Sequence, residues 1–112
     1  MNRGTTTFSA AGSQRVPVTR GNALLVQVDP TGYTGTIDLQ SSVDGATWTN
    51  HPYVQQNVLT PARSVSQISS PSSRTLYLML PPLVDVKIIV ACSAGSVVVT
   101  WREVKDPGDL PA

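Results

Sequence analysis

The sequence predicts an all-β protein, an antiparallel β-sandwich of about six to eight strands that is immunoglobulin-like or jelly-roll-like, with a closed barrel as the alternative. Three observations lead to this fold class. Apolar and polar residues alternate with a period of two in several short runs. Turn-forming residues separate these runs at intervals of roughly 8–12 residues. No run of useful length has the 3.6-residue period of an amphipathic helix, so we expect no helix.

The length of 112 residues suits one domain of ordinary size. We assign residues 1–14 to an N-terminal arm, residues 15–104 to the β-sandwich domain, and residues 105–112 to a C-terminal tail. The arm is rich in Thr, Ser, Gly and Ala, and Phe8 is its only aromatic residue. The tail contains two prolines and a glycine and should be extended.

The first strands are expected on either side of residues 20–22. Residues 15–19 alternate, but Pro17 has no amide proton to donate to a ladder, so this strand should lie at a sheet edge. Residues 23–29 form the next strand, and residues 30–34 have the composition of a turn. The inward face of the 23–29 strand is expected to hold Leu24, Val26 and Val28.

The stretch from Gly35 to Trp48 predicts a hairpin around which the core forms. A half-buried strand is followed by Asp44-Gly45, a strong reversal signal because Asp tolerates a left-handed backbone and Gly has no Cβ. Trp48 begins the returning strand. We expect its ring to lie in the core over Ile37 and Leu39.

Residues 49–63 alternate poorly, and we expect at most one short strand there, around Tyr53-Val54. Residues 64–69 suggest an irregular edge. Residues 74–80 are apolar on both faces, which is typical of a central strand or of a strand whose outer face meets another subunit. On the second interpretation, Tyr77 and Met79 face the partner.

The C-terminal part predicts a second hairpin. Pro81-Pro82 should form a corner. Residues 84–92 then alternate cleanly, Ala94-Gly95 predicts a tight turn, and residues 96–102 form the returning strand. Cys92 falls on the inward side of the first strand and is interpreted as a small buried hydrophobe.

Composition argues against several classes of function. Only 13% of residues are charged, compared with roughly 25% in typical soluble domains, which suits a protein held in an assembly. Eight basic residues oppose seven acidic ones and form no cluster, so we expect no nucleic-acid partner. No apolar run is long enough to span a membrane, and the first residues lack the apolar segment of a signal peptide. The single cysteine agrees with synthesis in a reducing cytoplasm.

No catalytic or metal-binding constellation is apparent, so we expect no enzyme activity, cofactor or metal. His51 is the only histidine and is interpreted as a surface residue on a strand. Without a plausible base partner, Cys92 does not suggest nucleophilic catalysis. Turn or outward-face roles are expected for Asp29, Asp38, Asp44 and Asp85. Positive backbone φ angles at turns are expected for Gly32, Gly35, Gly45 and Gly95.

Ser42-Val-Asp-Gly-Ala-Thr-Trp48 invites comparison with the Asp-box of sialidases. That motif has one more residue between Asp and Gly and recurs once per propeller blade, whereas here the motif occurs once. An exposed aromatic could still provide a platform for a sugar. A carbohydrate-binding module with Trp48, Tyr33 or Tyr53 as the platform is therefore an alternative function.

Over residues 23–104, the order of features resembles small β-sandwich structural proteins of tailed bacteriophages. The matching elements are the 35–48 hairpin, the apolar strand Leu76-Tyr-Leu-Met-Leu80, residues 83–90 and residues 93–100. Head-decoration (cement) proteins and tail or fibre modules have this succession. Pro81-Pro82 departs from the family's more usual Gly-containing turn, which concerns the local corner and not the fold.

The resemblance implies a non-enzymatic virion protein made in the bacterial cytoplasm, most plainly a decoration protein that stabilises the head across capsomer joints. Its partners would be the major capsid protein or other virion subunits, and it would be a homo-oligomer. One or both termini would lace into adjacent subunits. A head–tail or tail component is a further alternative. The residues expected at the interface are Phe8, Tyr33, Tyr53, Tyr77 and Met79.

Overall fold

The computed structural model describes residues 3–18, 23–51, 53–55, 63–64, 67–69, 71, 74–79 and 85–104. These ranges contain nine β-strands and no helix. The strands are β1 (Arg3–Phe8), β2 (Gly12–Pro17), β3 (Ala23–Ser42), β4 (Thr49–Asn50), β5 (Tyr53–Gln55), β6 (Arg63–Ser64), β7 (Ile68–Ser69), β8 (Thr75–Met79) and β9 (Asp85–Val104).

Every strand pair is antiparallel, which confirms the predicted all-β sandwich. The main strand order is β1-β9-β3-β8-β5-β6, with β2 added to β9 and with β4 and β7 added to β3. Nine strands are described where about six to eight were expected. The difference arises mainly at the N-terminus and in several strands of only two residues.

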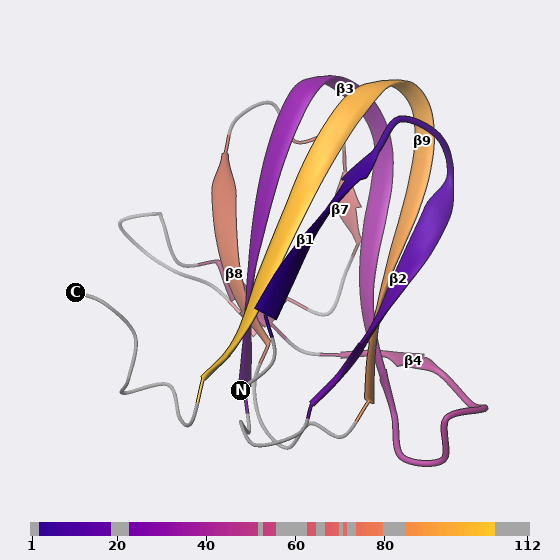
Figure 1. Cartoon of the computed structure of the whole chain (residues 1–112), viewed down its shortest axis with the longest axis vertical. Coiled ribbons are helices and arrows are strands. Elements are labelled where there is room, and N and C mark those ends of the chain that lie inside the picture. Colours follow the sequence, from indigo (N-terminus) through magenta and orange to yellow (C-terminus); the bar gives the residue numbers. More distant parts are fainter. Residues whose placement is uncertain are drawn as a thin grey trace.

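Two strands of 20 residues each, β3 and β9, form the centre of the molecule. They pair along their whole length, from Ala23 opposite Val104 to Ser42 opposite Asp85. Both strands bend sharply near their midpoints, and Figure 1 shows the two ribbons turning over together at the top. The single sheet is thereby folded into two layers. One layer holds β1, β8, β5 and β6, and the other holds β2, β4 and β7.

The core lies between these layers and consists of alternate residues from both halves of the long strands. The predicted inward residues of the 23–29 strand and those of residues 86–90 are all buried, which confirms both assignments. The inward parity changes from even to odd numbers across each bend. The buried residues that follow this alternation are Leu24, Val26, Val28, Ile37, Leu39, Val86, Ile88, Val90, Val97, Val99 and Trp101.

The two turns predicted at residues 30–34 and at Ala94-Gly95 are not chain reversals. Both segments are the bends of β3 and β9, and they lie side by side, with Thr34 opposite Ala94. Gly32 and Gly95 have φ angles of 58° and 71°, and the ladder changes register between Thr31 and Gly35. Glycines in the left-handed conformation change the direction of a strand without ending it. These turn-forming residues therefore bend the two strands and do not reverse them.

The prediction of an arm over residues 1–14 is wrong for its described part. Residues 3–8 form β1, which pairs with residues 97–102, and β2 begins at Gly12 and pairs with residues 85–90. Phe8 is buried, and a Cβ at Gly12 would lie 3.2 Å from its ring. The Phe8 ring therefore packs over Gly12, across the turn between these strands. β2 lies at a sheet edge, as Pro17 predicted. The predicted tail, residues 105–112, and Pro81-Pro82 lie outside the described residues.

Candidate binding surfaces

The five residues predicted at an interface are all buried inside the protein. Their exposed fractions range from 0% for Met79 to 8% for Tyr77, so the prediction that they face a partner is wrong. The strand at residues 53–55 exists, and it brings three of the five together. Tyr53 lies opposite Met79 on β8, and its ring meets that of Tyr77 edge-on with 5.4 Å between centroids. Burial raises the pKa of Tyr77.

Tyr33 belongs to the corner. Its side chain is 5% exposed, and its hydroxyl lies 3.0 Å from the carbonyl oxygen of Thr36 and 3.2 Å from that of Ala91. Burial, and to a lesser extent the nearby Cys92 thiol, raises the pKa of Tyr33. Because the phenol joins the two bent strands, Tyr33 is a structural residue and offers no platform for a sugar.

Trp48 lies outside the core, so the prediction that it covers Ile37 and Leu39 is wrong. The reversal after β3 is real, but β4 pairs with β3 only at Gln40 and Ser41. The ring is half-buried on the outer face of the β2/β9 layer. There the Lys87 Nζ atom lies 4.5 Å from the ring centroid, and the Arg15 guanidinium carbon lies 5.4 Å from it.

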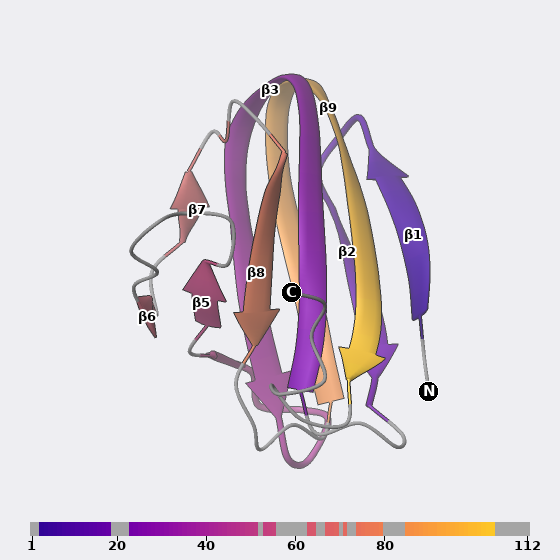
Figure 2. The same ribbon diagram turned by 90° about the vertical axis from the view of Figure 1, so that its left-hand side faces the viewer.

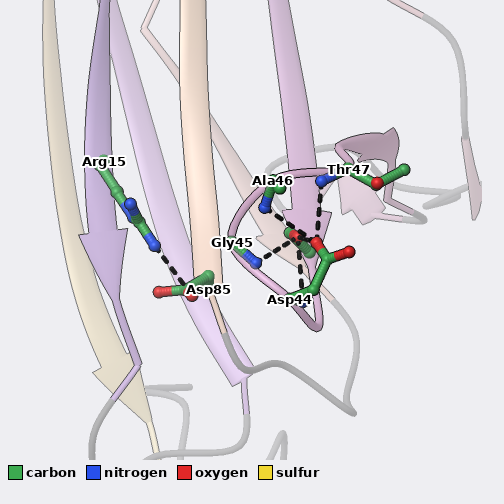
Figure 3. A network of polar contacts seen from close by, with 7 residues as sticks. Arg15, Asp44, Gly45, Ala46, Thr47 and Asp85 are labelled. Carbon is green, nitrogen blue, oxygen red and sulfur yellow. Dashed lines mark hydrogen bonds and ion pairs between the residues drawn. The ribbon is translucent and has the colours of Figure 1, made fainter.

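The loop before Trp48 is held by a compact network of hydrogen bonds (Figure 3). Oδ1 of Asp44 accepts hydrogen bonds from the amides of Ala46 and Thr47, both at 2.8 Å. The hydroxyl of Ser42 donates to the same carboxylate at 2.9 Å and accepts from the amide of Gly45 at 2.9 Å. Val43, at the tip, is 89% exposed. The loop therefore presents a fixed shape to solvent.

These hydrogen bonds, led by those from the Thr47 and Ala46 amides, lower the pKa of Asp44 to about 2. Because the folded-state pKa is depressed, the stabilisation is complete above the unfolded value of 3.8 and is lost as the pH falls toward 2. We expect an NMR titration to give this pKa, and we expect Ser42→Ala to raise it by removing one donor. A pKa near 3.8 in the native protein would contradict the network.

A basic cluster, defined as Arg15 and Lys87, lies beside this loop. The two residues are directly opposite each other on β2 and β9, an arrangement that is destabilising for like charges. Two features offset the repulsion. Arg15 forms an ion pair with Asp85 at 3.1 Å, and Lys87 lies over the indole of Trp48. Figure 3 shows the Arg15–Asp85 pair next to the loop.

A double-mutant cycle tests whether Lys87 holds the loop through the indole. We expect Lys87→Met and Trp48→Leu to couple by about 0.5–1 kcal/mol in the free energy of unfolding, measured in urea, because each substitution removes the cation–π contact. The matched control combines Trp48→Leu with Arg74→Gln, whose native partner is Asp29. This control pair should be additive, and a Lys87–Trp48 coupling as small as the control would contradict the contact.

Sequence reasoning missed Arg15 and Lys87 as neighbours. Their meeting depends on β2 pairing with β9, a contact between segments about 70 residues apart. A signal was present, because Lys87 has outward parity on a clearly alternating strand. The register of β2 on that strand has no such signal, since residues 12–17 contain only one buried apolar side chain among those described.

The remaining reactive side chains have structural roles. His51 is buried, not on the surface as predicted, and its Nδ1 lies 2.7 Å from the hydroxyl of Ser41. Cys92 is half-buried and packs against the core. Positive φ is confirmed for all four predicted glycines. Within the described ranges, no group of three or more His, Cys, Asp or Glu side chains could hold a metal ion.

The four aspartates that we assigned to turns or outward faces have those positions. Asp29 pairs with Arg74 at 3.2 Å, Asp38 accepts from Gln67 at 3.2 Å, and Asp85 pairs with Arg15.

In the part of the chain that the structure describes, no helix is long and apolar enough to cross a membrane.

Comparison with known proteins gives a likeness at the level of the fold. No family model and no curated protein matches the chain. Among solved structures, the SPBc2 prophage-derived protein YomS is similar, with a TM-score of 0.66 and 13% sequence identity. The match covers 90% of this chain and 93% of that chain. The two proteins therefore share a fold over nearly the whole of both chains.

Proposed function

We propose that this chain is a non-enzymatic structural protein of a bacteriophage particle, and specifically a decoration protein that stabilises the head by binding across capsomer joints. The observation that carries the proposal is the fold likeness to a prophage-derived protein over nearly the whole length of both chains. The order of sequence features resembles phage β-sandwich proteins and independently favours the same class. The partners would be the major capsid protein and further copies of this chain in the virion.

The surfaces available for such contacts differ from those expected from sequence. Since the predicted interface aromatics fill the core, binding must use exposed polar faces, loops and strand edges. β1 and β2 are edge strands that follow β9 over the corner, and Figure 2 shows β1 at one side of the molecule, opposite β5 and β6. An unpaired strand edge is a ready template for a neighbouring chain.

The test is the mass of the purified protein in solution, measured by light scattering with and without isolated capsid shells. We expect a shell-bound species at fixed stoichiometry, because a decoration protein occupies symmetry-related sites. A control with detached tails separates the head from the tail location. A monomer that associates with neither shells nor tails would overturn the proposal.

A second candidate function is carbohydrate binding through Trp48. The observation in its favour is that this indole lies outside the core beside an exposed loop, whereas Tyr33 and Tyr53 are buried. An aromatic side chain can contact a sugar, and the two cations that lie over this ring, Lys87 and Arg15, would favour an acidic glycan. We expect binding on a glycan array to be lost on Trp48→Ala with the fold unchanged. An array without any ligand would rule this function out.

A further inference from the structure

A second pair of like charges lies across β1 and β9, near the C-terminal end of β9. Arg3 on β1 is directly opposite Arg102 on β9, and both side chains are exposed. Among the described residues, no ion pair includes either arginine. Two cations directly opposite each other on one sheet face repel, so this arrangement is unfavourable unless an anion lies between them.

The Arg15–Lys87 pair on the same strand provides an internal comparison. There the repulsion is offset within the chain, by the Asp85 carboxylate and by the indole of Trp48. No described residue plays either part for the arginines at the other end of β9. An added anion would therefore relieve a repulsion that no described residue offsets.

The two arginines lie at the rim of an open cleft of about 420 Å³. Its other lining residues are Gly4, Thr5, Thr100 and Trp101. On the core side of β1 the indole of Trp101 packs against Gly4, where a Cβ would lie only 2.6 Å from Cζ2 of the indole. Nε1 of Trp101 is the one buried side-chain nitrogen or oxygen, within the described part of the chain, that has no hydrogen-bond partner. The cleft thus places two cations at the β1 edge, with a buried indole on the core side of the same strands.

The cleft lies along β1, which ends the order of the described strands and, among them, pairs on one side only, with β9. Alternate backbone N–H and C=O groups of β1 therefore point away from the sheet and are available to an added strand. The exposed backbone groups of β1 favour an acidic peptide over a small anion. A phosphate or a sugar acid would use the arginines alone, whereas an extended peptide would use the arginines and the backbone together.

We propose that the β1 edge binds an extended acidic segment of a partner protein, which adds to β1 as a strand and places its carboxylates on Arg3 and Arg102. Guanidinium groups match carboxylates with paired hydrogen bonds, and the carboxylates would remove the repulsion between the arginines. The proposal rests on these two arginines, the cleft and β1, and not on the virion function. It stands even if the chain does not bind phage shells.

The test uses the full-length protein and a fluorescein-labelled hexapeptide of alternating glutamate and valine, with binding followed by anisotropy at low salt. We expect saturable binding that weakens about tenfold for each of Arg3→Gln and Arg102→Gln, since each removes a charge-assisted contact. The matched control is Arg74→Gln, which removes one exposed arginine elsewhere and should leave the affinity unchanged. Because the native pair is repulsive, neither cleft variant should lower the melting temperature.

Two further probes separate strand addition from simple charge attraction. A peptide N-methylated at alternate amides keeps its carboxylates but cannot form the ladder, and it should bind at least tenfold more weakly. In a Trp48→Phe background Trp101 is the only tryptophan, and its emission should shift on binding. Equal effects of Arg74→Gln and the cleft variants would overturn the proposal, as would full affinity of the N-methylated peptide. The absence of saturable binding up to about 1 mM peptide, or stronger binding of a DNA oligonucleotide at the same arginines, would also overturn it.

Discussion

Replacing Gly95 with alanine should lower the free energy of unfolding by about 3 kcal/mol or more. Gly95 has a φ of 71°, and a Cβ there would lie 2.1 Å from the carbonyl oxygen of Gly32 and 2.4 Å from its carbonyl carbon. The left-handed backbone disfavours alanine, and the contact is with backbone atoms that cannot rotate away. Separation of the two strands at the bend would disturb both layers at once. Urea unfolding followed by circular dichroism measures the effect.

The matched control is Gly32→Ala, on the other strand of the same bend. Gly32 has a similar φ of 58°, but a Cβ there would meet nothing within 4 Å. We expect it to lower stability by only about 1 kcal/mol, which is the conformational term alone. Equal effects of the two substitutions would show that the close approach of the strands is not what makes Gly95 necessary.

The substitution Met79→Ala should lower the free energy of unfolding by about 2–5 kcal/mol. Met79 is 0% exposed and lies between Leu24 on β3 and Tyr53 on β5, so its truncation leaves a cavity among packed side chains. Under the proposed virion function, the folded fraction of this variant should bind capsid shells with unchanged affinity, because this side chain does not reach the surface. Urea unfolding and shell co-sedimentation provide the two measurements.

Val43→Ala is the control for Met79→Ala, since it truncates an apolar side chain that is 89% exposed. It should change stability by no more than about 0.5 kcal/mol. If Met79→Ala instead left stability unchanged and weakened shell binding, the interface interpretation from the sequence would be right and the core assignment would be wrong.

The fold class was predictable because alternation reports burial directly. Leu24, Val26 and Val28 are inward as their period of two requires, and the four expected glycines have positive φ. The shape of the sandwich was harder to predict. Glycine-containing turn sequences suit both a reversal and a corner, and only the pairing of residues 23–42 with 85–104 distinguishes the two. That pairing is a long-range property.

The β1 strand escaped prediction because its inward positions carry almost no apolar contrast. Gly4, Thr6 and Phe8 face the core side, while Arg3, Thr5 and Thr7 are exposed, so only one apolar side chain marks the alternation. The interface prediction failed at β8 for a related reason. Where both faces of a strand are apolar, parity does not tell which one meets the core, and both Tyr77 and Leu78 proved to be buried.

The candidate binding residues required tertiary information. The sequence singled out Trp48 but did not show which face of the sheet its ring covers. That face depends on how far β4 extends, and β4 is only two residues long. The pairs Arg3–Arg102 and Arg15–Lys87 each join residues that are remote in the sequence. Scattered in the sequence, these cations suggested no cluster. On the folded sheet, β9 brings each of them opposite a second cation.

The shared bent strands have a consequence for how the molecule melts. In many sandwiches each sheet has its own strands, so one sheet can in principle loosen while the other persists. Here β3 and β9 run through both layers, and the ladder from Ala23–Val104 to Ser42–Asp85 is continuous except at the bend. Neither layer can lose its central pair without disturbing that of the other. We therefore expect a single cooperative transition, with amide hydrogens on both layers exchanging through the same global opening.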